Sequence, residues 1–411
     1  MSNKFKNKFR KVSESVTLEL SLDNYILLPD SKVKCNIVLR PKYNIKLGKP
    51  DQEIIIKLTQ FEKCEYQKDE DESSTDKETL LINKKFVKHF PDSFSKKVII
   101  KDIEFEMPSA NNKLFLPTFE YRKKATNLFV RHLLTLEIPG FEVIESVGVI
   151  ICKLPNKVYK IEKKNSNIFK DRDISTFFGL KSEGKLSYNI SLKKQVYNSK
   201  EEIPINIIIN STELKYLNIE SIEVIFQRKI IIYGFLINTE EKSILDKKSF
   251  DKIKTEQKII NFNAQLKFDN KDIPDLSEKE IQKYTNFDEN FLDRDDNRTQ
   301  LTPSIDGSLF KCEYKIKINM NLDNIFGKTI SEYFIIDIYD LYNINSESIQ
   351  NNLKHYFLIK ENEFFEPKKT TNGDHIKNDK INDKNGKDMT NINEFVIFDH
   401  EDFISTVEGK K

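Results

Sequence analysis

The stretch KLSYNISLKKQVYNSKEEIPINIIIN, residues 185–210, has the pattern of a strand, a polar turn and a second strand. Apolar and polar residues alternate before the turn, and β-branched residues dominate after it. A similar stretch, LELSLDNYILLPDSKVKCNIVLR, occupies residues 18–40, with its own polar turn in the middle. The chain therefore contains this strand–turn–strand unit twice.

Two further pairs of segments repeat in the same order along the chain. QFEKCEY (60–66) and QRKIIIY (227–233) share a glutamine and a tyrosine at one spacing, and FVRHLLTLEI (129–138) matches FKCEYKIKIN (310–319). Conserved order over three segments predicts a duplicated domain of about 160–180 residues. The second copy carries a longer, charged insertion at about 268–301.

Period-two alternation in many short segments predicts an all-β fold of two tandem antiparallel β-sandwiches. In one such segment we expect Lys315 and Lys317 to face water while Tyr314, Ile316 and Ile318 face a core. The pattern also predicts polar loop insertions and a disordered C-terminal tail. The expected loops are residues 67–78 and 238–256, and one short helix is expected at 275–287.

Charge and cysteine content narrow the function classes. The 411 residues include 67 Lys and Arg against 65 Asp and Glu, so the chain lacks the basic surplus of a nucleic-acid binder. The four cysteines lie far apart, without a CxxC pair or a histidine at metal-ligand spacing. We therefore expect buried free thiols, no metal and no nucleic-acid partner.

No stretch of about 18 apolar residues and no signal-peptide pattern occurs, so we expect a soluble protein of a reducing compartment without a transmembrane segment. The chain contains no Walker loop, GxGxxG, GxSxG or HExxH motif, and its five histidines are scattered. His132 lies in a predicted strand and is expected to be structural. We expect no catalytic residue and no cofactor.

The repeated segments resemble the arrestin family, in the broad sense that includes arrestin-related trafficking adaptors. FEMPSANNKLFLPTFEY (105–121), followed by 129–138, is similar to a phenylalanine–proline segment and long strand of that family's N-terminal domain. Residues 184–212 resemble the opening of the C-terminal domain, and FRKVSESVTLEL (9–20) resembles the first strand. The resemblance covers roughly residues 9–360.

The resemblance implies four parts of the chain. They are an arrestin N-terminal-like sandwich at 9–160, a hinge at 161–183, an arrestin C-terminal-like sandwich at 184–362, and a disordered tail at 363–411 with an aromatic and acidic segment at 393–405.

The resemblance also implies a non-enzymatic cytoplasmic adaptor, recruited to the plasma membrane or endosomes. Its partners would be cytosolic tails or loops of membrane receptors and transporters, together with ubiquitin ligases or coat adaptors. The chain has no P-P-x-Y motif, so ligase recruitment has no support in the sequence. The alternative is a cargo-binding subunit of an endosomal sorting coat with the same double sandwich.

Two candidate interaction segments follow from the resemblance. Phe9-Arg10-Lys11 matches a motif whose basic residues touch phosphorylated tails, so Arg10 and Lys11 are candidate partner-binding residues; an ordinary basic N-terminus is the other reading. Cys152 stands where the family's phosphate-sensing arginine is expected, which favours phosphate-independent recognition.

The segment at 393–405 has three readings. Phe395, Val396, Phe398 and Phe403 could form a latch that docks back onto the first sandwich, through burial of apolar side chains. They could instead form a short peptide that hooks a coat adaptor, or belong to a disordered end.

Overall fold

The computed structural model describes residues 11, 13–68, 71–123, 126–153, 167–176, 181–214, 218–234, 238–251, 258–268, 278–287, 291, 300–323 and 329–339. The chain divides into two units, Met1–Tyr342 and Asn343–Lys411, and every described residue belongs to the first. The predicted tail at 363–411 therefore lies outside the described residues.

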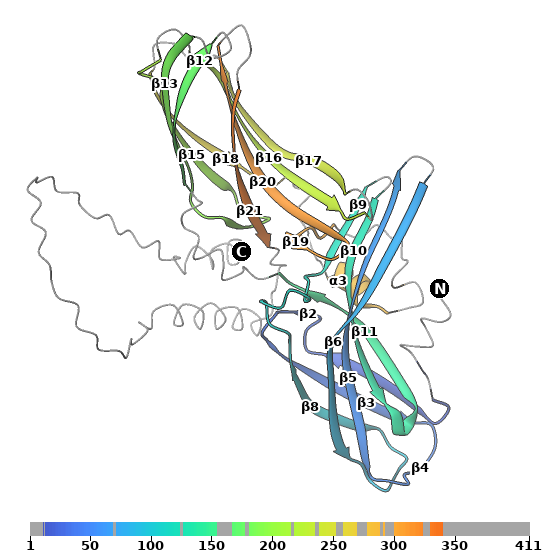
Figure 1. The fold of residues 1–411 in the computed structure, drawn as a ribbon. Helices are drawn as coiled ribbons and strands as arrows, with labels where there is room; N and C mark the ends of the chain where they lie inside the picture. The colour runs from blue at the N-terminus through green and yellow to red at the C-terminus, as the bar shows by residue number, and fades with distance from the viewer. Residues whose placement is uncertain are drawn as a thin grey trace, which may run out of the picture. The chain divides into compact units, whose positions relative to one another are not determined.

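The first half of the described chain forms two main sheets (Figure 1). A three-stranded sheet has the order β1 (Val16–Leu22), β3 (Lys32–Pro41), β8 (Val98–Glu106). The larger sheet has the order β2 (Ile26–Leu27), β11 (Val143–Ile151), β10 (Thr126–Ile138), β5 (Asp51–Lys68), β6 (Asp71–His89), with β9 (Phe119–Lys123) also beside β10. The short strands β4 (Ile45–Lys46) and β7 (Ser93–Phe94) pair separately, and a 3-10 turn, η1 (Pro139–Phe141), joins β10 to β11.

The second half repeats this plan. A four-stranded sheet has the order β12 (Asn167–Thr176), β13 (Lys181–Leu192), β15 (Ile203–Asn210), β18 (Ile259–Leu266). The larger sheet has the order β14 (Val196–Asn198), β21 (Thr329–Tyr339), β20 (Phe310–Leu322), β16 (Ile219–Ile232), β17 (Thr239–Asp251), with β19 (Ile305–Asp306) also beside β20. One helix, α3 (Glu278–Thr285), lies among the described residues of the insertion.

The strand order confirms the duplication predicted from the repeated segments. The larger sheets correspond strand for strand, and in each the short first strand runs parallel to its neighbour: β2 to β11, and β14 to β21. The repeats at 60–66 and 227–233 lie in β5 and β16, and those at 129–138 and 310–319 lie in β10 and β20. The fold is therefore two tandem antiparallel sandwiches, as the alternation predicts.

Each sandwich buries the apolar side chains of its alternating strands. Tyr314, Ile316 and Ile318 on β20 are fully buried, which confirms the expected inward face of that strand. Cys35, Cys64, Cys152 and Cys312 are buried free thiols, as expected from their apolar surroundings. Because a thiolate is costly to bury, burial raises the pKa of Cys35 to about 12 and that of Cys64 to about 11.

The core of the second sandwich also includes side chains from the first. Phe119 and Tyr121 on β9, with Leu128 and Val130 on β10, belong to the same buried cluster as the strands β13 to β21. The Phe119 and Phe310 rings lie with their centroids 5.0 Å apart. The two sandwiches therefore share a continuous apolar contact rather than lying at the ends of a free connection.

The predicted hinge at 161–183 is wrong for part of its length. Residues Asn167–Thr176 form strand β12, which pairs with β13 and buries Ile174, with a bulge between Ile174 and Ser175. The stretch is polar because β12 is an edge strand, and an edge strand gains its backbone hydrogen bonds from one neighbour without needing two apolar faces. The boundaries 9–160 and 184–362 stay predictions.

Two predicted loops also form strands. Residues in the 67–78 stretch extend the β5–β6 hairpin, and most of 238–256 is β17 (Figure 1). Both β6 and β17 are the outermost strands of their sheets. Charged residues on an outer strand keep their heads in water, so composition alone predicts a loop where backbone pairing makes a strand.

The helix predicted at 275–287 is confirmed in its described part by α3, and several described residues of the charged insertion are buried. Tyr284, Phe287, Phe291 and Leu301 are buried. Phe287 and Phe291 pack with Phe61, Phe129 and Leu133 of the first sandwich. Leu301 exchanges two backbone hydrogen bonds with Glu120, at 2.7 and 3.0 Å. Two phenylalanines of this charged insertion, Phe287 and Phe291, therefore pack its described part against β10.

Candidate interaction site

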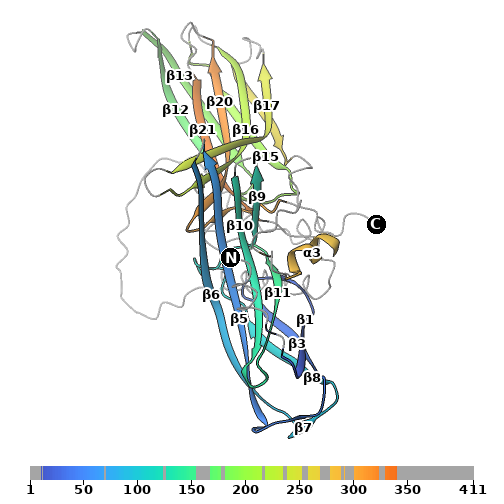
Figure 2. The same ribbon diagram turned by 90° about the vertical axis from the view of Figure 1, so that its right-hand side faces the viewer.

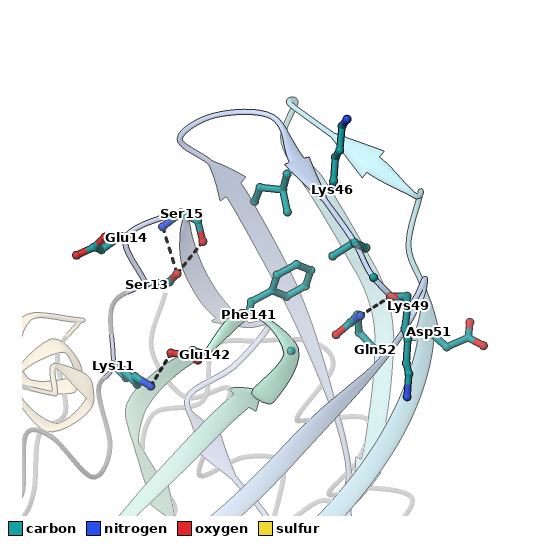
Figure 3. Close-up of a pocket in the computed structure, with 14 residues that line it drawn as sticks. Lys11, Ser13, Glu14, Ser15, Lys46, Lys49, Asp51, Gln52, Phe141 and Glu142 are labelled. Carbon is teal, nitrogen blue, oxygen red and sulfur yellow. Dashed lines mark hydrogen bonds and ion pairs between the residues drawn. The ribbon is translucent and has the colours of Figure 1, made fainter.

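A depression of about 920 Å³ lies at one end of the first sandwich and contains Lys11, a residue singled out by the sequence (Figure 3). Its walls come from the segment before β1, from β4 and the start of β5, and from the η1 turn. The lining residues are Lys11, Ser13, Glu14, Ser15, Ile45, Lys46, Leu47, Gly48, Lys49, Asp51, Gln52, Gly140, Phe141 and Glu142.

The η1 turn shapes the floor of the depression. At Gly140 an added Cβ would lie 1.7 Å from Gln52 Oε1, so a side chain there would displace the end of the Gln52 side chain. Gln52 in turn donates from Nε2 to the Lys49 carbonyl at 2.5 Å. Phe141 anchors the turn, because its ring packs edge-on against Phe90 and Phe94 at centroid distances of 5.5 and 5.8 Å.

Lys11 is held at the rim by its backbone. Lys11 N–H donates to the Ile144 carbonyl and Ile144 N–H donates to the Lys11 carbonyl, both at 3.0 Å. The Lys11 ammonium lies 3.1 Å from Glu142 Oε2, and both side chains are exposed. An exposed pair of this kind adds little stability, so the ammonium can exchange Glu142 for another anion at low cost.

The charges lining the depression are balanced. The lining includes three ammonium groups, on Lys11, Lys46 and Lys49, and three carboxylates, on Glu14, Asp51 and Glu142. Asp51 Oδ1 also lies 2.8 Å from His89 Nδ1, where the carboxylate can accept a hydrogen bond from the ring N–H. A cradle for phosphate needs an excess of positive charge and converging donors, and this lining instead suits a mixed polar peptide.

The remaining predicted site residues are not tested by these contacts. Arg10 lies outside the described residues, as do Phe395, Val396, Phe398 and Phe403. Their roles as partner-binding residues and as a latch or peptide motif stay predictions.

Cys152, which stands where the family's arginine is expected, is buried. The next residue, Lys153, carries a positive charge. Cys152 N–H donates to the Leu27 carbonyl at 3.0 Å, which holds it against β2. Lys153 donates to the Ser304 carbonyl at 2.6 Å and forms an ion pair with Asp337 on β21. A cation of the first sandwich therefore contacts a buried carboxylate of the second, a contact that sequence reasoning missed.

A second charged contact lies under the insertion. Arg131 and Glu120 form a buried pair, with Arg131 Nε 2.6 Å and Nη2 3.2 Å from the two carboxylate oxygens. Arg131 also donates to the Phe291 carbonyl, and its guanidinium lies 4.1 Å from the centre of the Phe129 ring. The signal for this site was visible in the sequence, since an arginine in the middle of FVRHLLTLEI needs a buried partner.

Glu62 provides a third link between the sandwiches. Its carboxylate accepts from Ser308 Oγ at 2.7 Å and from Leu309 N–H at 2.6 Å. At Gly307 an added Cβ would lie 2.4 Å from Glu62 Oε1 and 3.1 Å from the Phe310 carbonyl, so a side chain there would displace the Glu62 carboxylate. Tyr121 Oη also donates to Glu241 at 2.8 Å. These polar contacts surround the shared apolar core.

The described residues show no group of three or more histidine, cysteine or acidic side chains placed to hold a metal ion. Their buried histidine has a structural role, because His132 lies between Thr118 Oγ1 at 3.2 Å and Gln60 Oε1 at 3.3 Å. No helix in the described part of the chain is long and apolar enough to cross a membrane.

Two tandem sandwiches of matching topology, joined by a shared core, define a protein with the arrestin architecture. Residues 182–339 match the family model described as arrestin (or S-antigen), C-terminal domain. This span runs from β13 to β21, so the second sandwich is similar to the C-terminal domain of arrestins. No curated protein matches the chain.

Proposed function

We propose that the chain is a non-enzymatic adaptor of the arrestin type. It binds cytosolic parts of membrane receptors or transporters and links them to endocytic, ubiquitin-dependent or signalling machinery. The observation that carries the proposal is the arrestin C-terminal domain at 182–339, fused through a shared core to a second sandwich of the same topology. Such a pair offers rigid surfaces on which peptide segments of partners can bind.

The depression around Lys11 is the cargo-binding surface of this proposal. It is polar and charge-balanced, and its floor is set by Gly140 and Phe141. Cargo recognition there does not depend on phosphate, because the lining contains as many carboxylates as lysines and so has no excess of positive charge. The adaptor works in the cytoplasm and is recruited to the plasma membrane or to endosomes by its cargo.

Proximity labelling of the full chain in cells tests both statements. We expect membrane transporters or receptors to dominate the labelled proteins, and phosphatase treatment of their tails to leave binding in a subsequent pull-down unchanged. Lys49→Glu reverses one charge of the lining and should reduce labelling of these proteins several-fold. Lys84→Glu, at an exposed position on β6, is the matched control.

A different pattern would contradict the proposal. If the same few soluble coat subunits are labelled at constant stoichiometry, the protein is a structural subunit of a sorting coat. If Lys49→Glu and Lys84→Glu change labelling equally, the depression is not the cargo site.

A further inference from the structure

The last described strand of the second sandwich has an open edge. On one side β21 pairs with β20 from Thr329 to Ile336. On the other side β14 pairs with β21 only from Asp337 to Tyr339. Among the described residues, no strand pairs with 329–336 on that side (Figures 1 and 2). We call residues 329–336 the β21 open edge.

The direction of the backbone groups follows from one hydrogen bond. Asp337 N–H donates to the Gln195 carbonyl at 2.8 Å, so the backbone of Asp337 points away from β20. Backbone groups in a strand alternate in direction with a period of two. The N–H and C=O groups of Thr329, Ser331, Tyr333 and Ile335 therefore point outward along the β21 open edge, ready to pair with an added strand.

The side chains of this edge differ from those of β6 and β17, the outermost strands at the far ends of the two larger sheets. β6 and β17 carry many lysines and acids, such as Lys84, Lys88, Glu240 and Lys242, which oppose pairing with another chain. The outward-facing residues of the β21 open edge are uncharged. Two of them are large and exposed: Tyr333 is 62% exposed and Ile335 is 47% exposed. This edge is therefore not protected against pairing in the way the other two are.

The inner side of the edge carries a surplus of positive charge. Glu332 is buried and accepts from Lys170 Nζ at 2.7 Å, Arg172 Nη2 at 2.7 Å and Tyr188 Oη at 2.5 Å. Two cations thus face one carboxylate, and both are more than two-fifths exposed. The nearby Asp171 is paired with Lys185 at 3.1 Å, and Lys315 lies over the Tyr333 ring while paired with Glu313. Lys170 and Arg172 can therefore bind one more carboxylate on the inner side of the edge.

The state of Glu332 agrees with this charge pattern. Burial by itself would raise the pKa of Glu332, but hydrogen bonds from Lys170 and Tyr188 and the nearby Arg172 outweigh it and keep the pKa below its usual value. Glu332 therefore remains ionised while it holds Lys170 and Arg172 beside the edge.

We propose that the β21 open edge binds an extended acidic segment of a partner protein as an added strand. The segment alternates apolar and acidic side chains. The apolar ones lie on the outer face beside Tyr333 and Ile335, and the acidic ones on the inner side face Lys170 and Arg172. This surface lies on the second sandwich, so it goes beyond the cargo depression of the first and is tested independently of it.

A labelled peptide tests the proposal on the full chain. The probe is a fluorescent decapeptide that alternates valine with aspartate, and binding is measured by fluorescence anisotropy. Controls are a peptide of the same composition with its valines in one block, and the alternating peptide methylated on every second backbone nitrogen. We expect the alternating peptide to bind and both controls to bind at least about tenfold more weakly. The block peptide loses the alternation of valine and aspartate, and the methylated peptide loses the backbone N–H groups that pair with the edge.

Variants of the chain locate the peptide. Ser331→Pro removes one outward N–H without removing a backbone hydrogen bond to β20, although it also removes the 2.8 Å hydrogen bond from Ser331 Oγ to Asn319 Oδ1. Lys170→Gln removes one inner cation. Each should weaken binding about tenfold, while Ser249→Lys on the outer strand β17 should leave it unchanged. Thermal unfolding of each variant shows whether it folds.

Hydrogen exchange on the unchanged chain tests where the peptide binds, even if Ser331→Pro does not fold. The amides of Ser331, Tyr333 and Ile335 should exchange rapidly without peptide and become protected with it, while those of Glu332 and Phe334 stay protected throughout. Equal binding of the methylated peptide overturns the proposal. So does protection of the outward amides before peptide is added, because the chain's own tail or a second copy then occupies the edge.

Discussion

At the scale of single residues, three polar side chains buried in the first sandwich, Arg131, Glu120 and His132, are each paired. Arg131 and Glu120 hold each other and the Phe291 carbonyl under the insertion, and His132 lies between a hydroxyl and an amide. Removing one member of such a pair leaves the other buried without a counter-charge, which is why buried charges come in sets. These residues support the fold around the candidate surfaces without touching them.

His132 makes stability depend on pH. Burial lowers the pKa of His132 to about 3, against about 6.5 in an unfolded chain. The unfolded state therefore binds the proton first, so stability is complete above pH 6.5 and is lost as the pH falls towards 3. Between pH 7 and pH 5 we expect His132 to account for a loss of about 2 kcal/mol in the free energy of unfolding.

Urea unfolding of the unchanged chain and of His132→Gln at both pH values measures that loss. The glutamine variant is less stable at pH 7, but its stability should change less between the two values. Identical pH dependence in the two proteins would show that His132 is not buried as a neutral ring.

At the scale of elements, glycines decide where the insertion can lie. Gly148 on β11 faces the insertion, and an added Cβ would lie 2.3 Å from the Tyr284 carbonyl and 2.8 Å from the Phe291 ring. A backbone carbonyl has less freedom to shift than the end of a long side chain. The contact between β11 and the insertion therefore depends on the absence of one methyl group.

We expect Gly148→Ala to lift the insertion from the first sandwich, at a cost of about 1–3 kcal/mol. Limited proteolysis should cut the variant within 278–291 faster than the unchanged chain. Gly48→Ala is the matched control, because its Cβ meets no atom within 4 Å. Equal cleavage of both variants would mean that the insertion does not rest on β11.

At the scale of the whole described unit, the two sandwiches are coupled through a mixed contact. Phe119 and Tyr121 enter the core of the second sandwich, and around them lie Lys153 with Asp337 and Glu62 with Leu309. An apolar centre gives most of the attraction, and the buried charged groups fix one alignment because each must meet its partner. Cargo bound on one sandwich and a strand bound on the other would therefore act on one connected body.

Phe119→Ala tests this coupling. Loss of a fully buried phenylalanine should cost about 3–5 kcal/mol, and the loss should reach both sandwiches. Hydrogen exchange would then rise in β10 and also in β20, since Phe119 packs against Phe310. If only β10 loses protection, the two halves unfold independently. Leu114→Ala, at an exposed position, is the control.

The repeated segments, the period-two alternation and the scattered cysteines were enough to determine a duplicated all-β fold, its inward faces and its buried thiols. These features depend on which side chains avoid water, and that information is local to each strand. The helix in the insertion was visible from a capping-box pattern, Ser277 followed by Glu280, which is also local to its segment.

Pairing between distant segments was decided only by the tertiary structure. The polar stretches in β6, β12 and β17 are strands because a neighbour offers them backbone hydrogen bonds, and no local pattern records that neighbour. The ion pair of Lys153 with Asp337 and the depression around Lys11 join residues from separate elements. The β21 open edge exists because β14 is only three residues long and ends before reaching it.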